Sequence, residues 1–279
     1  MYLGLASSAP GQDKQFMNIA KTTEQFGSFV IETTERWGKS CIFLLRIVSA
    51  LCKPPFRPYL YFQQVLQIGV NSSLVIGLIG LFTGAVLAVQ GEYTLSKFGA
   101  NAYTGPAVAL SLIRELGPVL TALMVIGRAG SAVTAEVGIM RITEQIDALR
   151  SMAVDPIRYL MAPRLVAGVI AMPLLCAMFN VVGILGGYIV AVGLLGLSSG
   201  TFMSQIESAV GLVDVYSGFI KATVFGLIFG WVSCYKGYTC GFGAQGVNKA
   251  TTQSVVTASV AVLIVDYFLT SVLTRVFMQ

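Results

Sequence analysis

Four ionisable residues stand inside apolar stretches of this 279-residue chain that are long enough to cross a membrane. Arg114 and Glu115 share one stretch, and Lys221 and Asp266 lie in two others. A charge at the centre of a bilayer costs about 2.5 to 3.5 kcal/mol on insertion scales, so the default reason for keeping one there is function. Two cations and two anions could neutralise one another between helices, or they could surround a polar ligand.

The apolar stretches are the elements that must position these charges. Segments of about 20 apolar residues, the length that crosses a bilayer, are found near 65–90, 107–130, 160–197, 214–235 and 253–274. They predict five spans. The third is too long for one upright helix. Two alternatives are open: a long tilted helix broken near Pro173 or near the group of Gly183, Gly186 and Gly187, or a helix with a re-entrant turn.

A depth count brings the four charges together. With about 1.5 Å of rise per residue and a hydrocarbon core of about 30 Å, all four lie roughly 10 Å from the same membrane surface. One interpretation is a set of ion pairs that holds the helices together. The other is a cavity open to the outer leaflet, where Arg114 and Lys221 meet an anionic head group and apolar walls take the acyl chains. Arg128 falls near the opposite surface, as expected for a snorkelling anchor.

Composition is typical of a polytopic membrane protein, because 55% of the residues are hydrophobic, 11% are charged and the mean hydropathy is +0.77. The net charge of +5 does not indicate nucleic-acid binding, since Lys and Arg sit mostly at the ends of apolar segments. With no histidine and no CxxC pair among the five cysteines, we expect neither a metal site nor a disulfide framework. Residues 1–40 lack a signal-peptide pattern.

The distribution of positive charge predicts the orientation of the chain. Lys and Arg are frequent before the first span and recur in the loops after the second and fourth spans. By contrast, residues 91–106 contain only Lys97, and residues 198–213 contain neither residue type. Cytoplasmic loops carry the excess of Lys and Arg, so the N-terminus is predicted inside and the C-terminus outside.

Residues 1–58 are predicted to form a separate N-terminal region, followed by a five-span domain at 59–279. From Phe16 to Leu51, apolar residues recur at helical spacing, which indicates amphipathic helices. We expect them to lie along the inner membrane surface, and a coiled coil or a packed soluble helix is the alternative. The three prolines of KPPFRP end this region.

A second amphipathic stretch lies between spans 2 and 3, at about 141–154. Apolar side chains share one helical face there and polar ones occupy the others: Ile142, Ile146, Leu149 and Ala153 against Glu144, Gln145, Asp147 and Arg150. This helix could rest on the bilayer. Its acidic, polar face better fits a groove on a cytoplasmic partner.

Two catalytic motifs occur only in fragments. Gly38, Lys39 and Ser40 resemble the end of a P-loop, but Thr33 stands where the first glycine is required. The GLSSG run at 196–200 has the spacing of a serine nucleophile motif, yet the chain has no histidine to act as base, and a flexible turn explains it better.

Three small-residue pairs indicate close helix packing within or between subunits: Gly80 with Gly84, Gly183 with Gly187, and Gly226 with Gly230.

One long ordered stretch carries a resemblance to a known family. RELGPVLTALMVIGRAGSAVTAEVGIMRITEQIDALRSMAVDP, followed by PRLVAGVIAMPLL and GILGGY, closely resembles the MlaE-type permeases of lipid ABC transporters, which work with Mce-domain proteins. The resemblance covers about residues 60–275. It implies an all-α integral membrane protein with an N-terminal amphipathic interfacial helix region, then five transmembrane helices with a cytoplasmic coupling helix between spans 2 and 3.

The resemblance also implies roles for the chain and its residues. Arg114, Glu115 and Lys221 match polar positions that line the lipid cavity, and Asp266 matches an acidic position. Glu144, Gln145, Asp147 and Leu149 belong to the coupling helix on this pattern. The expected partners are a second copy of the chain, a cytoplasmic ABC ATPase that binds ATP and Mg, a periplasmic MlaD-like Mce-domain protein and the lipid, all at the bacterial inner membrane.

We therefore expect a permease subunit, with no ATPase site or cofactor of its own, that moves phospholipid between the inner membrane and the periplasmic partner. A transporter of sterols or other apolar lipids is one alternative, and it would leave Arg114 and Lys221 as structural pairs. An intramembrane lipid-modifying enzyme, with Glu115 or Asp266 as acid or base, is a second. A scaffold that only anchors the Mce protein is a third.

Overall fold

A computed structural model of the protein describes residues 31, 34–35, 37–51 and 58–277. The chain divides into two compact units, Met1–Val48 and Ser49–Gln279. Residues 37–51 are helical. Residues 1–30, which include the first part of the predicted amphipathic stretch, and residues 52–57, which hold most of the KPPFRP stretch, lie outside the described residues.

Five helical segments in the described part of the chain are long and apolar enough to cross a membrane, as predicted. Only helices, and no strands, are found among the described residues, which confirms the all-α membrane class. The five spans are α2 (Pro58–Ser96), the series from η1 to α5 (Asn101–Ile142), the pair η4 and α7 (Ile157–Gly193), α9 (Leu212–Tyr238) and α10 (Gly243–Phe277).

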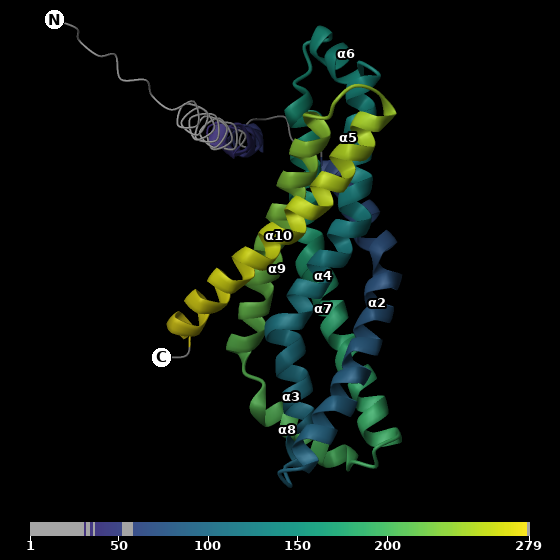
Figure 1. Ribbon diagram of the computed structural model, residues 1–279, viewed down its shortest axis with the longest axis vertical. Coiled ribbons are helices and arrows are strands. Elements are labelled where there is room, and N and C mark those ends of the chain that lie inside the picture. Colours follow the sequence, from purple (N-terminus) through teal and green to yellow (C-terminus); the bar gives the residue numbers. More distant parts are fainter. Residues whose placement is uncertain (1–30, 32–33, 36, 52–57, 278–279) are drawn as a thin grey trace, which may run out of the picture. The chain divides into compact units, whose positions relative to one another are not determined.

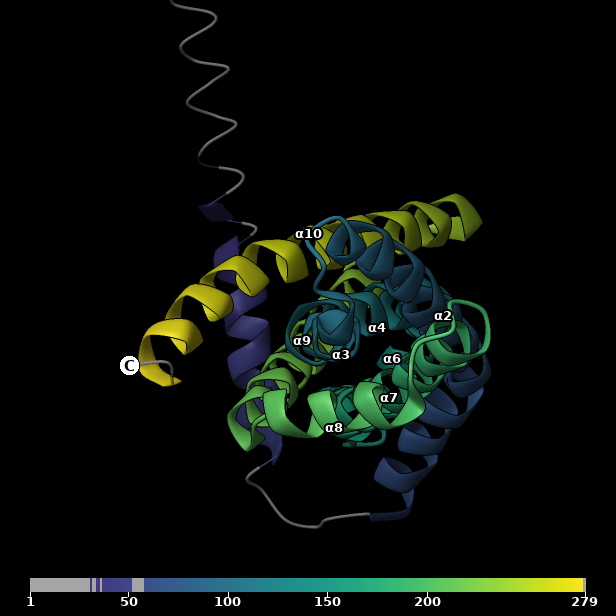
Figure 2. The same cartoon turned by 90° about the horizontal axis from the view of Figure 1, so that it is seen from below.

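The second span is a chain of short segments rather than one regular helix. Two π-helical stretches interrupt it, and π-segments often mark functional sites. Its parts are η1 (Asn101–Tyr103), α3 (Thr104–Ser111), η2 (Leu112–Leu116), α4 (Gly117–Val125), η3 (Ile126–Gly130) and α5 (Ser131–Ile142). Half of its most apolar 18-residue window is buried, the largest share among the five spans. Figure 2 accordingly shows α3 and α4 between α2, α7, α9 and α10.

The third span is one continuous helical segment, broken neither near Pro173 nor near the glycine group and without a re-entrant turn. After the π-helical turn η4 (Ile157–Met161), α7 runs without a break from Ala162 to Gly193 and includes Pro173. Its neighbours α2 and α9 pack along it, so the tertiary contacts hold the helix through the position where Pro173 cannot donate a backbone hydrogen bond.

Glycines let α2 and α7 approach to backbone contact. A Cβ atom at Gly80 would lie 2.9 Å from the carbonyl oxygen of Phe179, and one at Gly84 would overlap the carbonyl of Gly183. On the other side of α7, a Cβ at Gly230 of α9 would lie 2.8 Å from the Cα of Leu165. The predicted small-residue pairs therefore make helix contacts within this chain.

Two short helices connect the spans at opposite ends of this unit. The helix α6 (Gln145–Ser151) lies between α5 and η4, and α8 (Ser199–Ala209) lies between α7 and α9. Figure 1 places α6 at one end and α8, with the start of α3, at the other. α6 is shorter than the predicted 141–154, because Arg141 and Ile142 continue α5 and both Glu144 and Ala153 have left-handed backbone conformations. The GLSSG run forms an irregular loop at 196–198 and then the first two residues of α8.

Candidate functional site

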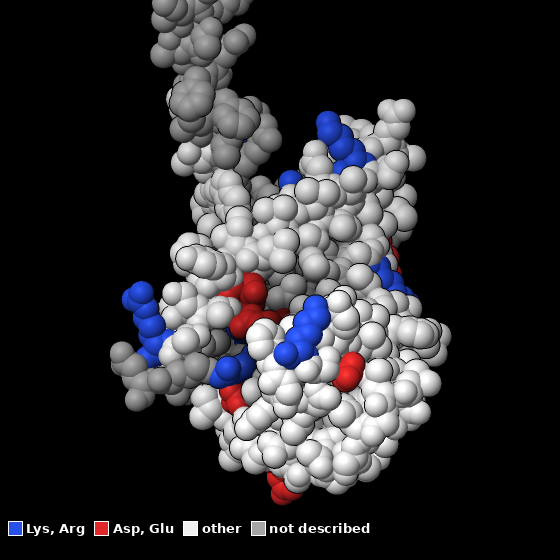
Figure 3. All heavy atoms as spheres, turned by 60° about the horizontal axis from the view of Figure 1, so that its bottom comes forward, with Lys and Arg blue, Asp and Glu red and all other residues white. Residues whose placement is uncertain are grey.

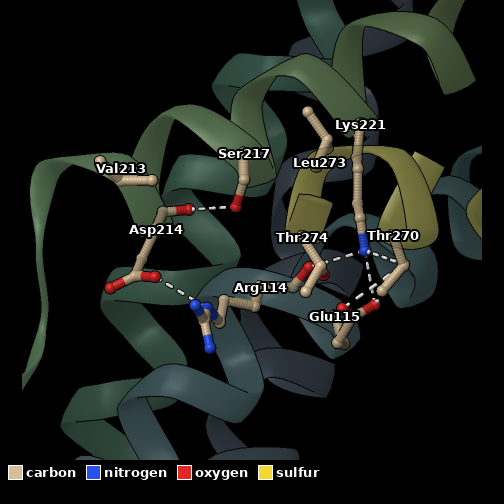
Figure 4. A pocket seen from close by; sticks show the side chains of 9 residues that line it. All are labelled: Arg114, Glu115, Val213, Asp214, Ser217, Lys221, Thr270, Leu273 and Thr274. Carbon is tan, nitrogen blue, oxygen red and sulfur yellow. Dashed lines mark hydrogen bonds and ion pairs between the residues drawn. The ribbon is translucent and has the colours of Figure 1, made fainter. Parts of the chain in front are cut away.

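A cleft of about 170 Å³ lies between the second, fourth and fifth spans. Its lining comes from η2, from the first turns of α9 and from the last turns of α10: Arg114, Glu115, Val213, Asp214, Ser217, Lys221, Thr270, Leu273 and Thr274. Figure 4 shows these side chains pointing toward one another from the three elements. Seen from the end that holds α3 and α8, acidic and basic side chains gather in a hollow of a mostly uncharged surface (Figure 3).

Lys221 is the centre of the network in this cleft, and its side chain is only 2% exposed. A lysine ammonium group has three N–H donors, and a buried one needs a partner for each. The Nζ atom donates to three acceptors: the carbonyl oxygen of Arg114 at 3.1 Å, Glu115 Oε2 at 2.5 Å and Thr270 Oγ1 at 2.7 Å. All three donors are thereby used.

Asp266 is the second anion beside Lys221. Its Oδ1 atom lies 3.1 Å from the Nζ atom, which is ion-pair distance, but it accepts no directed hydrogen bond. The three N–H groups of Lys221 are donated to other acceptors, so none is left for Asp266. Asp266 is therefore held near Lys221 by charge attraction alone.

Pro118 explains why a backbone carbonyl takes part in the network. In an α-helix the amide of residue 118 would donate to the carbonyl of residue 114, and proline has no amide hydrogen. Pro118 stands in the first turn of α4, directly after the π-helical η2 that carries Arg114 and Glu115. The carbonyl of Arg114 thus lacks its usual donor, and Lys221 from α9 supplies one.

The guanidinium group of Arg114 turns away from Lys221 and pairs with Asp214 (Figure 4). The Nε atom lies 2.7 Å from Asp214 Oδ1. The other carboxylate oxygen of Asp214 accepts a hydrogen bond from the amide of Gly211 at 2.9 Å and so caps the start of α9. One carboxylate therefore both ends the α8–α9 loop and fixes the arginine.

The structure brings the four sequence-predicted residues together within one chain: Arg114, Glu115 and Lys221 line the cleft, and Asp266 lies beside Lys221 without lining it. It pairs Lys221 with Glu115 and Asp266, whereas Arg114 pairs with Asp214. Sequence reasoning missed Asp214 and Thr270 as members. Their spacing could have indicated them. Asp214 stands seven residues, or two turns, before Lys221, and Thr270 stands four residues after Asp266. Each therefore shares a helical face with a residue that was predicted for the site.

A second polar cluster crosses from α5 to α2 and α7. Arg164 of α7, whose side chain is 5% exposed, pairs with Glu136 Oε2 at 3.0 Å, and Gln67 of α2 donates to Glu136 Oε1 at 2.9 Å. Arg128, predicted as a snorkelling anchor, is exposed on this chain and also donates to Ser72 Oγ at 3.0 Å. These contacts link α2, α5, α7 and η3.

The four residues predicted for the coupling helix lie on or beside α6. Glu144 and Gln145 are exposed at its start, and Leu149 is half-buried. Asp147 is occupied within the chain, since its Oδ1 atom lies 3.1 Å from Arg141 and 3.2 Å from Arg150. Its negative charge is therefore already matched by two cations.

Comparison with known proteins gives one family match and several relatives. The model of the family described as permease MlaE matches residues 61–272. The intermembrane phospholipid transport system permease protein MlaE of Haemophilus influenzae is 47% identical over 258 residues, which are 91% of this chain and 98% of that protein.

Two further relatives extend the comparison to other organisms. A probable ABC transporter permease protein of Rickettsia typhi is 41% identical over 260 residues, 93% of this chain and 99% of that protein. The chloroplastic protein TRIGALACTOSYLDIACYLGLYCEROL 1 of Arabidopsis thaliana is 37% identical over 209 residues, 75% of this chain and 60% of that protein.

Proposed function

Because this chain belongs to the MlaE permease family of multi-pass membrane proteins, we propose that it is the membrane subunit of an ABC transporter that moves phospholipid. In this proposal the lipid passes between the inner membrane and a periplasmic Mce-domain protein. A separate cytoplasmic ATPase binds ATP with Mg and drives the movement. The chain acts as a homodimer, with its N-terminus in the cytoplasm and its C-terminus in the periplasm.

The observation that carries the proposal is an ion-paired cleft inside a mostly apolar bundle. Four charged side chains line it, Arg114, Glu115, Asp214 and Lys221, and a fifth, Asp266, lies at ion-pair distance from Lys221. A purely structural pair needs no opening, but here the Glu115 side chain is 45% exposed and the Arg114 side chain is 33% exposed. We propose that this exposed polar surface receives a lipid head group while the acyl chains stay among apolar side chains.

In this proposal the ATPase acts on the permease at α6, at the opposite end of the bundle. α6 lies at the other end of the bundle from the start of α9 and the end of α10 (Figure 1), whose residues line the cleft. Its exposed residues Glu144 and Gln145 with the half-buried Leu149 are proposed to bind in the ATPase. Closure of two ATPases would push on two copies of α6, shift the spans of each subunit and narrow the cleft, so that the lipid leaves. Asp147 serves inside the subunit by holding Arg141 and Arg150.

The test is ATP-dependent transfer of a fluorescent phospholipid from proteoliposomes containing the whole complex to soluble Mce-domain protein. We expect transfer with the complete complex, no lipid chemistry by the purified chain alone, and a loss of transfer in Glu144→Lys. Glu207→Lys, the same charge reversal on exposed α8, is the matched control. Conversion of lipid by the chain alone would favour the enzyme, and unchanged transfer in Glu144→Lys would favour the scaffold.

A further inference from the structure

The ion-paired network at the cleft holds one more carboxylate than it holds cations, because Asp266 belongs to it as the neighbour of Lys221 although it does not line the cleft. Arg114 faces Asp214, and Lys221 faces both Glu115 and Asp266, so two positive groups meet three negative ones. An unmatched negative charge in such a poorly hydrated place is costly, and a cation from outside would offset that cost.

Lys221 has no N–H donor available for an anionic ligand. Its three N–H groups are donated to the Arg114 carbonyl, to Glu115 and to Thr270, and the ammonium group is buried behind them. A phosphate could reach Lys221 only by displacing a carboxylate at 2.5 Å. The lysine therefore works as an internal counter-ion and does not present a positive surface to the cleft.

Glu115 is the group that a ligand meets first. Its side chain is 45% exposed, compared with 19% for Asp266 and 11% for Asp214. Lys221 and Thr270 hold the Glu115 carboxylate from one side, and a carboxylate has further acceptor positions beyond those two. Asp266 Oδ1, which accepts no hydrogen bond, adds to the negative field behind it.

Building on the proposed function, we infer that the cleft selects phospholipids whose head group carries a primary ammonium group, and that Glu115 binds this group. The class is that of phosphatidylethanolamine. The ammonium group restores the charge balance, and its N–H donors fit the open lone pairs of Glu115. The phosphate of such a zwitterionic lipid faces the side of Arg114, the adjacent residue, whose guanidinium group is part-exposed.

The experiment equilibrates the purified complex with mixed micelles of equimolar phosphatidylethanolamine and phosphatidylglycerol, followed by repurification and mass spectrometry of the retained lipid. For the natural chain we expect a bound ratio about fivefold in favour of phosphatidylethanolamine, the preference that one part-exposed ion pair supports. Glu115→Gln should bring the ratio close to one. Glu207→Gln, the same change on α8, should leave the ratio as it is in the natural chain.

A ligand-side control does not depend on a variant that folds. The natural complex is given phosphatidylethanolamine and its N-acetylated form, which keeps the phosphate and loses the positive charge. We expect about fivefold weaker retention of the acetylated lipid. Equal retention of both, or an unchanged ratio in a folded Glu115→Gln complex, would overturn the inference while the proposed lipid transport stands. A natural complex that retains no lipid at all would count against the proposed function itself.

Discussion

Arg150 of α6 donates a hydrogen bond from Nη2 to the hydroxyl oxygen of Tyr238, the last residue of α9. The guanidinium carbon of Arg141 also lies 5.8 Å from the centre of the same ring. α9 carries Asp214 and Lys221 at its other end. One continuous helix therefore connects the short helix α6 with two charged residues of the cleft.

Tyr238→Phe removes the hydroxyl but keeps the ring under Arg141, so it isolates the hydrogen bond. We expect α6 to open more often, with amide hydrogen exchange at Ala148 and Met152 several-fold faster, because a hydrogen bond to a charged donor contributes about 1 kcal/mol or more. Tyr267→Phe, an exposed tyrosine on α10, is the control. Equal exchange in both variants would show that the contact does not hold α6. In the complex, Tyr238→Phe should also slow ATP-driven lipid transfer.

Lys221→Met leaves Glu115 and Asp266 without their cation. Breaking a buried pair costs about 3 to 5 kcal/mol, and the exposure of Glu115 points to the low end. We expect the apparent melting midpoint in detergent to fall by about 5 to 10 °C. Lys249→Met, at an exposed position of α10, should change it little. The double variant Lys221→Met with Glu115→Gln should recover part of the lost stability. Equal melting midpoints of Lys221→Met and Lys249→Met would show that the network does not stabilise the fold.

Gly84→Ala tests the contact between α2 and α7. The added methyl group would overlap the carbonyl of Gly183, and both helices would have to separate. Overpacking of this kind costs about 1 to 3 kcal/mol, so we expect a lower melting midpoint and less monodisperse protein. Gly127→Ala is the control, because no heavy atom lies within 4 Å of a Cβ built there. Similar behaviour of the two variants would contradict the packing.

The five spans could be predicted because an apolar run of bilayer length is recognised from the sequence alone, without knowing which helices pack against it. Their ends were not, since helices such as α10 continue well beyond the apolar core, from Gly243 to Phe277. Whether Pro173 breaks α7 could not be read from the sequence either, because packing by α2 and α9 decides it. Local pattern therefore fixes which segments span, and tertiary contact fixes where each helix begins and ends.

The charges of the cleft were found from their cost in an apolar segment, and counting residues gave a common depth. Which charge pairs with which could not be predicted from the sequence, because the pairing depends on the rotation of each helix. It also depends on the π-helical η2, which shifts the register of Arg114 and Glu115. Asp214 was overlooked because it stands at the start of α9, where a carboxylate is an ordinary cap. Its second bond, to Arg114, appears only in three dimensions.

Cys240 lies in the connection between α9 and α10, and burial raises the pKa of its thiol, with Arg141 acting in the opposite direction. A raised pKa leaves less thiolate at neutral pH, so alkylation of a chain with Cys240 as its single cysteine should be slow at pH 7.5. The rate should climb as the pH rises past about 8.5, the ordinary value for a cysteine. A cysteine in place of Phe242, which is fully exposed, gives the comparison rate. Equal rates at pH 7.5 would contradict the shielding.

The proposed orientation predicts which loops a membrane-impermeant maleimide can reach. Phe98, between the first and second spans, is 80% exposed, and Phe242, between the fourth and fifth spans, is 100% exposed. Three spans separate the two loops, so they face opposite sides of the membrane. With the N-terminus in the cytoplasm, Phe98→Cys in a cysteine-free chain should be labelled in spheroplasts, because its loop faces the periplasm. Phe242→Cys should be labelled only after the membrane is opened. The reverse pattern would invert the protein and place α6 on the periplasmic side, where no ATPase could reach it.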